Sequence, residues 1–408
     1  MFFDFRRAAR LSTVVCLCTT SAASAQSITR DIIIDADFPE GEPLEKAIDY
    51  FDGGSIPSVV VGNGRGGIYL YRSSTGTLEG PWKRSIINPS GSAYERARPL
   101  RFKGETYPGL IASLSNQIVW LQNPRNRAEG GDIAAPWPLH VINPDHGCHD
   151  IRLFDLDGDG KIDVICSGAI SLRGPQFVAF QDDPTHWNVI YDIADVGDDI
   201  AVLEVRGSEV PNLVGATHSG ETFWYENPRM TGGNARQPHW TRHLIGPGNV
   251  GNSFAAGPFS SMQDSVISAP NEHEGPGGAT DERGFVWYEQ PEDPTTPWIA
   301  HDIGPDYRDI HEVSMGTWND GTPYVLVAEQ ENACAPAMPE GNPPTHPGIP
   351  CRISLFEWKN GDVRTTVLTQ DSTHNQALVP WHGGLLMADA NHGAYGASTA
   401  VHLRLIMP

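Results

Sequence analysis

Basic residues and long apolar runs are both scarce in this sequence. Lysine and arginine together number 28 against 50 aspartates and glutamates, which gives a formal net charge of −22. A surface this acidic repels phosphates, so nucleic acid and anionic membranes are not expected as partners. An anionic glycan stays compatible with this charge if basic residues gather in one cleft. Beyond residue 25, no apolar run is long enough for a membrane span.

The first 25 residues have the pattern of a secretory signal peptide. Arg6, Arg7 and Arg10 precede the short apolar run LSTVVCLCTTSAASA, and the residues at 23–25 fit an A-x-A cleavage site. A membrane anchor is the alternative, but the apolar run is shorter than a bilayer requires. We therefore expect an exported, soluble protein, secreted or periplasmic, whose mature chain is a single domain over residues 26–408.

Cysteine is also scarce, with six in the chain, two of them in the leader. The other four, Cys148, Cys166, Cys334 and Cys351, suit two disulfides in an oxidising compartment. Of the three pairings, we favour Cys148–Cys166, which flanks an acidic turn between two expected antiparallel strands. Cys334–Cys351 would then close a proline-rich loop. A zinc site is the alternative, although neither pair has C-x-x-C spacing.

No long segment has helical periodicity, and the apolar runs are short, β-branched and separated by turn residues, which indicates an all-β protein. A tryptophan followed by an alternating strand recurs at steps of 50 to 58 residues, at Trp82, Trp137, Trp187, Trp240 and Trp298. Strings such as VWLQNP, FWYENP and VWYEQP precede several of them, and an earlier apolar strand occurs seven times. Four short strands per repeat predict the blades of a β-propeller.

The two ends of the chain predict how the ring closes. The last repeat stops one strand short, and the mature N-terminus begins with an orphan strand, RDIIIDADF. That strand would complete the last of seven blades. A sandwich or a β-helix is the alternative, but neither explains the missing strand. The sequence therefore predicts a seven-bladed β-propeller closed by its N-terminal strand.

The turn FDLDGDGKIDVI places Asp155, Asp157, Asp159 and Asp163 at loop positions 1, 3, 5 and 9. Ca²⁺ takes six to eight oxygen ligands, which these carboxylates provide together with the Lys161 carbonyl and water. The helix-flanked calcium loop ends in a glutamate at position 12, which this turn lacks, and its flanks are strands. We therefore predict a strand–loop–strand site for one structural calcium ion.

This turn resembles the FG-GAP (or VCBS) repeat of integrin-like propellers, strongly over residues 149–168 and weakly elsewhere. In that family the aspartates bind calcium between the first two strands of a blade, which the resemblance implies here as well. The chain is also similar in type to the propeller lyases that cleave uronate polysaccharides, and to the propeller part of aldos-2-ulose dehydratase. These resemblances concern fold and repeat, and fold by itself does not imply function.

In a propeller, one rim around the central funnel is formed by the starts of the inner strands and by the loops between second and third strands. The strand starts supply Arg96, Arg98, His149, Asp198, Asn252, His311 and His374. The loops supply Asn63, Arg65, Asn116, Arg173, His218, Asn271, His273, Glu329, Gln330, Asn391, His392 and Tyr395. In contrast, His140, His243 and His301 follow outer-strand tryptophans, and we interpret them as exposed structural residues.

A histidine or tyrosine can abstract the proton beside a carboxylate or ketone while an arginine neutralises the enolate, which is the chemistry of β-elimination. We expect His149 and His218 to act as base or metal ligands, Arg98 to clamp a carboxylate, and His311 and Tyr395 to serve as further acid/base groups. Clustered imidazoles could instead hold a second divalent metal in the funnel. Paired carboxylates are scarce there, which disfavours a two-carboxylate glycosidase. The chain also lacks a G-x-S-x-G elbow and a phosphate loop.

Two function classes follow from these patterns. The first is an exported carbohydrate-active enzyme, a lyase or dehydratase that performs β-elimination on a uronate-containing glycan or keto-sugar. The second is a non-catalytic, calcium-stabilised propeller that binds glycans or proteins at the cell surface. The expected ligand is carbohydrate, an acidic glycan or sugar. A purely structural role is disfavoured by the polar funnel, and the oligomeric state stays open.

Overall fold

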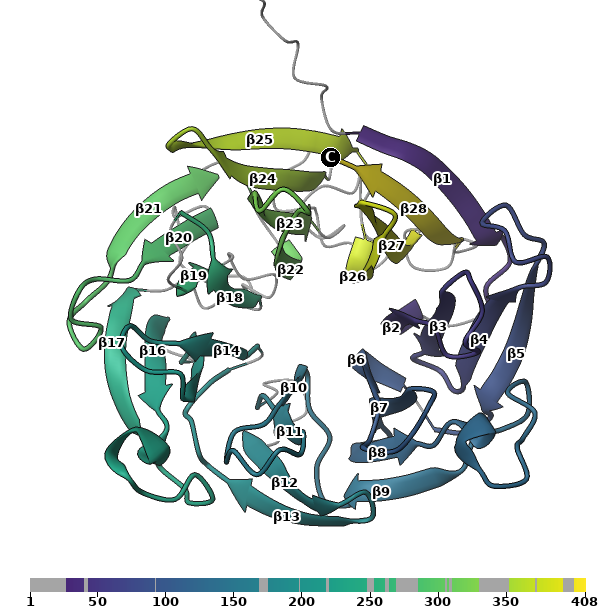
Figure 1. Ribbon diagram of the computed structural model, residues 1–408, viewed down its shortest axis with the longest axis horizontal. Helices are drawn as coiled ribbons and strands as arrows, with labels where there is room; N and C mark the ends of the chain where they lie inside the picture. The colour runs from purple at the N-terminus through teal and green to yellow at the C-terminus, as the bar shows by residue number, and fades with distance from the viewer. Residues whose placement is uncertain are drawn as a thin grey trace, which may run out of the picture.

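Seven four-stranded antiparallel sheets stand around a central axis in the computed structural model of the chain (Figure 1). The structure describes residues 27–39, 43–91, 93–168, 175–197, 199–217, 220–247, 253–260, 264–268, 285–304, 307, 310–329, 352–370, 373–391 and 400–408. Each sheet is one blade, with its first strand nearest the axis and its fourth at the perimeter. The predicted all-β, seven-bladed propeller is confirmed.

Blades one to three follow one another in chain order. Blade one contains β2 (Pro43–Asp49), β3 (Ser58–Asn63), β4 (Ile68–Ser73) and β5 (Trp82–Asn88). Blade two contains β6 (Ala93–Leu100), β7 (Gly109–Leu114), β8 (Gln117–Leu121), the 3-10 helix η1 (Pro124–Asn126) and β9 (Leu139–Asn143). Blade three contains β10 (Ile151–Phe154), β11 (Asp163–Cys166), β12 (Phe177–Asp183) and β13 (His186–Tyr191).

Blades four to seven repeat this order. Blade four contains β14 (Ala201–Glu204), β15 (Pro211–Ala216), β16 (Glu221–Glu226), η2 (Pro228–Thr231) and β17 (Thr241–Pro247). Blade five contains β18 (Phe254–Pro258), β19 (Asp264–Ser268), β20 (Phe285–Glu289) and β21 (Ile299–Gly304). Blade six contains β22 (Ile310–Thr317), β23 (Pro323–Glu329), β24 (Ile353–Lys359) and β25 (Asp362–Thr369). Blade seven contains β26 (Thr373–Trp381), β27 (Gly384–Asn391), β28 (Val401–Met407) and β1 (Ser27–Asp35).

Strand β1 closes the ring. It pairs antiparallel with β28, with Ile32 opposite Leu403 and Ile33 opposite His402. The N-terminal strand thus completes blade seven, as predicted from the missing strand of the last repeat. Residues 1–25, the predicted signal peptide, lie outside the described residues.

The second strands β3, β7 and β15 are buried along their full length. Their sequences are short apolar runs without alternation, because each is covered on both faces by neighbouring blades. Between blades one and two, for example, Val60 and Leu70 pack in one cluster with Leu110 and Val119. Each such fully buried aliphatic side chain contributes roughly 1.5–3 kcal/mol, so packing between blades holds the ring together.

The recurring tryptophans close the loops between third and fourth strands. In every case the indole Nε1 donates a hydrogen bond to a carbonyl oxygen three to five residues earlier. The pairs are Trp82 to Leu78 (2.9 Å), Trp137 to Ile133 (3.0 Å), Trp187 to Pro184 (3.3 Å), Trp240 to Ala235 (3.2 Å) and Trp298 to Pro294 (3.1 Å). The sequence repeat therefore has a local structural cause.

The three histidines that follow outer-strand tryptophans lie against tryptophans of the third strands. Ring centroids are 4.6 Å apart for Trp120 and His140, 4.3 Å for Trp224 and His243, and 4.1 Å for Trp287 and His301. These stacks support the structural interpretation. They also shield the rings more than expected, since the His243 side chain is only 18% exposed.

A disulfide joins Cys148 to Cys166, whose Cα atoms are 5.5 Å apart. It links the chain just before β10 to the end of β11, as predicted. Cys334 and Cys351 lie outside the described residues. No helix in the described part of the chain is long and apolar enough to cross a membrane.

Candidate functional site

A buried charged cluster spans the central channel. Arg96, on β6 of blade two, is 1% exposed. Its Nη1 atom lies 3.0 Å from Glu312 Oε2 on β22, 3.4 Å from Asp150 Oδ1 and 3.8 Å from Asp199 Oδ2. One guanidinium thus reaches carboxyl groups from blades three, four and six. The Glu312 contact is an ion pair by distance, without the alignment of a hydrogen bond.

Two further arginines extend this cluster. Arg152 Nε on β10 lies 2.8 Å from Asp150 Oδ2, and its Nη2 lies 3.2 Å from Asp199 Oδ1. It also donates hydrogen bonds to the carbonyls of Ile200 (2.7 Å) and Phe254 (3.2 Å), at the starts of the inner strands of blades four and five. Arg98 Nη2, two residues after Arg96 on the same face of β6, lies 3.1 Å from Asp150 Oδ1.

The two buried aspartates differ in pKa. Burial disfavours ionisation of Asp150, but Arg152 and Arg96 outweigh it and hold the pKa of Asp150 below its usual range. Burial and repulsion from Asp150 raise the pKa of Asp199 well above its usual range. The surroundings thus favour the ionised form of Asp150 and disfavour the ionised form of Asp199.

The channel cluster, as we call it, consists of three arginines and three carboxyl groups: Arg96, Arg98, Asp150, Arg152, Asp199 and Glu312. The guanidiniums stay protonated at neutral pH. The Arg98 and Arg152 side chains are 21% and 22% exposed, whereas Arg96 is enclosed. The three carboxyl groups are at most 4% exposed, so solvent reaches the cluster at Arg98 and Arg152.

An apolar cavity of about 330 Å³ adjoins this cluster along the channel. Arg152 lines it together with residues of β10, β14, β18 and β22, which include Leu153, Val202, Ala256 and Met315. The channel is thus charged at the starts of the inner strands and apolar farther along them.

Of the five residues predicted to be catalytic, the structure describes the side chains of two, His149 and Arg98. His149, directly before Asp150, is 3% exposed, and Arg98 contacts Asp150. The backbone of His311 lies in β22 beside Glu312, but its side chain is outside the described part of the structure. His218 and Tyr395 lie outside the described residues.

Sequence reasoning missed four members of the channel cluster, namely Asp150, Arg152, Asp199 and Glu312. A signal for them exists in the charged residues next to apolar ones at the starts of the inner strands, as in HDIRLF, DDIAVLE and IHEVSM. Their meeting depends on the ring, because each strand supplies one or two charges and blades far apart in sequence supply the rest.

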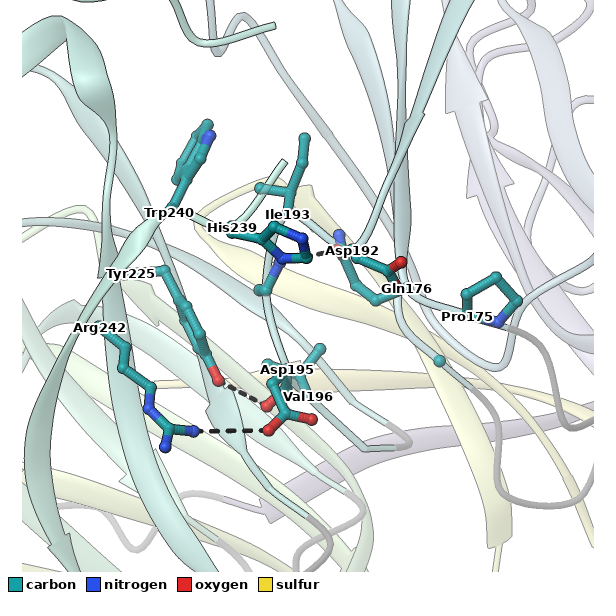
Figure 2. Close-up of a pocket in the computed structure, with 12 residues that line it drawn as sticks. Pro175, Gln176, Asp192, Ile193, Asp195, Val196, Tyr225, His239, Trp240 and Arg242 are labelled. Atoms are coloured by element: carbon teal, nitrogen blue, oxygen red, sulfur yellow. Dashed lines mark hydrogen bonds and ion pairs between the residues drawn. The ribbon is translucent and has the colours of Figure 1, made fainter. Parts of the chain in front are cut away.

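A second cavity, of about 510 Å³, lies between blades three and four (Figure 2). There the Tyr225 hydroxyl donates to the Asp195 carbonyl, and Arg242 Nη1 lies 3.4 Å from Asp195 Oδ2. Burial raises the pKa of Tyr225, so its hydroxyl remains a donor. The same residue types recur at blade one as Asp35, Tyr71 and Arg84. We therefore interpret these residues as structural. In both blades the tyrosine and the arginine hold the aspartate, and with it the chain segment that leads into the blade.

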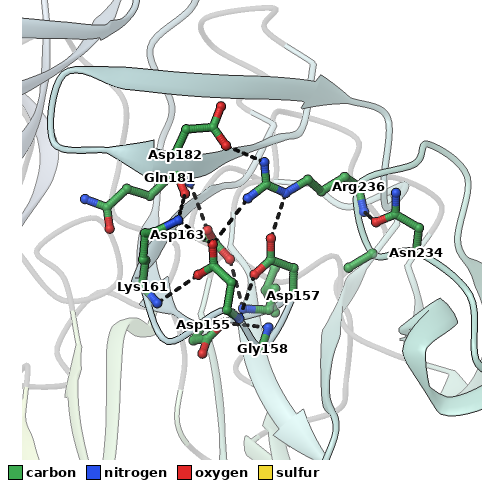
Figure 3. A network of polar contacts seen from close by, with 12 residues as sticks. Asp155, Asp157, Gly158, Lys161, Asp163, Gln181, Asp182, Asn234 and Arg236 are labelled. Carbon is green, nitrogen blue, oxygen red and sulfur yellow. Dashed lines mark hydrogen bonds and ion pairs between the residues drawn. The ribbon is translucent and has the colours of Figure 1, made fainter.

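The acidic turn follows β10 on the side away from the channel cluster (Figure 3). Asp155, Asp157 and Asp159 offer carboxylate oxygens that lie within 4.8 Å of one another. Asp155 also accepts hydrogen bonds from the backbone N–H groups of Gly158 (2.6 Å) and Gly160 (2.9 Å). Both glycines have positive φ, +76° and +82°, which the tight turn requires.

Asp163 is placed differently from the other three aspartates. It is fully buried, and its carboxylate accepts hydrogen bonds from the backbone N–H groups of Leu156 (2.9 Å) and Gln181 (3.0 Å). Burial, with smaller contributions from Asp157 and Asp155, raises the pKa of Asp163 to about 7. In the structure Asp163 stabilises the turn through these hydrogen bonds from its buried side.

Two basic side chains neutralise part of the turn. Lys161 Nζ lies 2.7 Å from Asp159 Oδ2. Arg236, from the loop between β16 and β17 of blade four, lies 2.7 Å from Asp157 Oδ2 through Nε and 2.6 Å from Asp182 Oδ1 through Nη1. The turn of blade three is thereby tied to blade four. Three clustered carboxylates still form a donor set that fits a hard divalent cation.

Comparison with known proteins adds support for the fold alone. No protein-family model matches the chain, and no curated protein matches it either. Among solved structures, two crystal structures of BBS1N in complex with ARL6DN, one soaked with lead and one with mercury, match at TM-scores of 0.52 and 0.53. The identities are 9% and 10%, over 94% of this chain and 97% of the other. The FG-GAP and lyase resemblances remain interpretations of the sequence.

Proposed function

We propose that the protein is an exported, glycan-binding β-propeller that holds the carboxylate of an acidic sugar at the channel cluster. The observation that carries this proposal is that arginines are the solvent-accessible part of the channel cluster, in a chain whose net charge is −22. Arginine binds carboxylates through paired N–H donors, and such charge-assisted bonds are strong in a poorly hydrated site. Arg98 and Arg152 are the partly exposed members able to donate to a ligand.

The direction of approach follows from the lining of the channel. From the apolar side, a sugar would have to bring its hydroxyl groups through the cavity lined by Leu153, Val202 and Met315, where they would lose hydration without new partners. We therefore place the sugar at the rim where the inner strands begin. The Cys148–Cys166 disulfide is consistent with the proposed secreted or periplasmic location.

Elimination on a uronate is the second candidate function. It is favoured by the position of Arg98, which contacts Asp150, the residue that directly follows His149. A carboxylate clamp and a candidate base thus lie in the same part of the channel. The second divalent metal proposed for the funnel would depend on His149 and His218, and His218 lies outside the described residues. The acidic turn is separately proposed to hold one structural calcium ion.

The binding proposal is tested by calorimetric titration with a uronate oligosaccharide and with the same oligosaccharide after reduction of its carboxyl groups. We expect at least tenfold tighter binding of the acidic form. Arg98→Gln should weaken that preference, because it removes one of the two accessible guanidiniums. Arg84→Gln is the matched control, since Arg84 is also paired with an aspartate but lies at blade one. Equal affinity for both oligosaccharides would refute the proposal, and binding of a protein ligand alone, as BBS1N is seen with ARL6DN, would replace it.

Elimination is tested on the same uronate oligosaccharide by following the ultraviolet absorbance of an unsaturated product, with and without added divalent metal. If the wild-type protein forms this product and His149→Ala does not, the protein is an eliminating enzyme that requires His149. Saturable binding without product would leave the protein as a binding module.

A further inference from the structure

Blades four and five carry the same structural unit at their third and fourth strands. Trp224 in β16 and Trp287 in β20 occupy equivalent positions in the strings FWYE and VWYE. Each indole is stacked by a histidine of the fourth strand, His243 at 4.3 Å and His301 at 4.1 Å between centroids. The two tryptophans can therefore be compared directly.

The two indoles differ in the loop of the next blade that lies beside them. Trp224 Nε1 donates a hydrogen bond of 2.9 Å to the carbonyl of Pro294, in the long loop between β20 and β21 of blade five. The corresponding connection in blade six, between β24 and β25, is only the two residues Asn360 and Gly361. Trp287 is 3% exposed, and its Nε1 has no hydrogen-bond partner among the described residues. Leaving a buried donor unpaired costs about 1–3 kcal/mol.

The junction of blades two and three follows the same rule. Blade three turns between β12 and β13 through Pro184 and Thr185, and Trp120 Nε1 of blade two also lacks a partner among the described residues. A short turn in the following blade is thus what leaves the indole N–H unpaired.

A cavity of about 530 Å³ lies where blade six lacks the long loop. Trp287 and Trp358 form its aromatic part, with ring centroids 5.3 Å apart, and Ser260 contributes a buried Oγ that has no partner in the described part of the chain. By equivalence with Trp224, the Trp287 N–H is directed toward blade six, whose β25 supplies Val363 and Thr365 to the lining.

The charge of the cavity lining indicates the charge of the ligand that it would bind. Glu289, Asp302 and Asp362 line it, and none of its described lining residues is lysine or arginine. Among the described residues, Glu289 is paired with His301, at 3.1 Å. A ligand that brings positive charge is therefore favoured over a neutral or acidic one.

We propose that the cavity between blades five and six binds a basic, proline-containing peptide segment of a partner protein. The bound proline takes the place that Pro294 has at the preceding junction and presents its carbonyl oxygen to the Trp287 N–H. Aromatic-lined grooves suit proline-containing peptides, which lose little conformational entropy on binding. Basic residues beside the proline pair with the three carboxylates. This site is independent of the proposed glycan site.

The probe is a capped octapeptide built on the blade-five loop QPEDPTTP, residues 290–297, in which both acids are replaced by arginine to give QPRRPTTP. Binding is measured by calorimetry and by the change in tryptophan emission. We expect saturable one-to-one binding of QPRRPTTP. The peptides QPRRATTP and QPEDPTTP should bind at least tenfold more weakly, because the first lacks the central proline and the second brings negative charge.

Trp287→Phe is the decisive variant, because it removes the indole N–H and keeps an aromatic ring. Since that N–H has no partner among the residues that the structure describes, the variant should unfold at the same denaturant concentration as wild type or a higher one, while binding QPRRPTTP about tenfold more weakly. Trp224→Phe is the matched control, which loses its hydrogen bond to Pro294 and should be less stable but bind the peptide normally.

Three results would overturn the proposal. These are the absence of saturable binding of QPRRPTTP, equal binding of the acidic peptide, and unchanged binding by Trp287→Phe. Displacement of the peptide by a neutral oligosaccharide, lost in Thr365→Arg, would assign the cavity to sugar instead.

Discussion

Two clusters of arginines and aspartates lie at opposite ends of β10 in blade three, and they present opposite charges to solvent. At its start, the channel cluster encloses its carboxyl groups and leaves the guanidiniums of Arg98 and Arg152 partly exposed. At its end, the carboxylates of Asp155, Asp157, Asp159 and Asp182 outnumber Lys161 and Arg236. Similar side chains therefore favour an anion at one end and a cation at the other, because burial decides which of them solvent reaches.

The largest expected effect is on the free energy of unfolding, and it tests whether burial makes the channel cluster more important for stability than the acidic turn. Arg96→Met should lower the free energy of unfolding by about 3–5 kcal/mol, since it leaves buried carboxylates without their central cation. Urea denaturation at pH 7 measures this. Arg236→Gln in the acidic turn is the control and should cost below about 1 kcal/mol, because a partly exposed ion pair contributes little. Equal losses would show that burial does not distinguish the clusters.

Calcium should stabilise the protein through the acidic turn. At a concentration one hundred times its dissociation constant, a single bound ion raises the free energy of unfolding by about 2.7 kcal/mol. Scanning calorimetry in CaCl₂ and in chelator should show this gain as a higher Tm. Asp157→Asn should remove it, whereas Asp183→Asn, an exposed aspartate of the same blade, should keep it. A Tm that does not respond to calcium would contradict the calcium site. The acidic turn would then be neutralised by the Arg236 and Lys161 side chains instead.

Protonation of Asp163 makes the turn sensitive to pH in chelator. Its pKa is about 7 in the folded chain, compared with about 3.9 when unfolded, so the folded state binds more protons between these values. Stability from this group is therefore full below about pH 4 and is lost as the pH rises through about 7. We expect a decline of about 3–4 kcal/mol, measured by urea denaturation as the difference between wild type and Asp163→Asn. A difference that grows with pH would contradict the assignment.

The smallest effect concerns competition for the turn. Arg236 lies 2.7 Å from Asp157 and competes with a metal ion for that carboxylate. Arg236→Gln should tighten calcium binding about two- to fivefold, which corresponds to the modest energy of a partly exposed ion pair. Calcium titration by calorimetry measures this. The neighbouring Arg242→Gln, which contacts Asp195 instead, should leave calcium affinity unchanged.

Much of the fold could be predicted because each blade is built from local patterns. In five of the seven blades, a tryptophan at the start of the fourth strand closes its own loop within three to five residues, so its spacing reports the blade length. The Cys148–Cys166 pair flanks one hairpin, and the three clustered aspartates lie within five residues. Such features depend on neighbours along the chain and are therefore visible in the sequence.

The channel and the junctions between blades depend on the closed ring. Arg96 meets Glu312 only because blades two and six face the same axis, and the pKa of Asp199 is raised because it is buried beside Asp150. Likewise, Trp287 Nε1 lacks a partner among the described residues because of a short turn in the next blade. The amino-acid sequence by itself thus determined the strands, the blade repeat, the ring closure and the acidic turn. Tertiary structure alone decided which charges are buried together and which donors stay unpaired, because burial and long-range proximity set the energies of those groups.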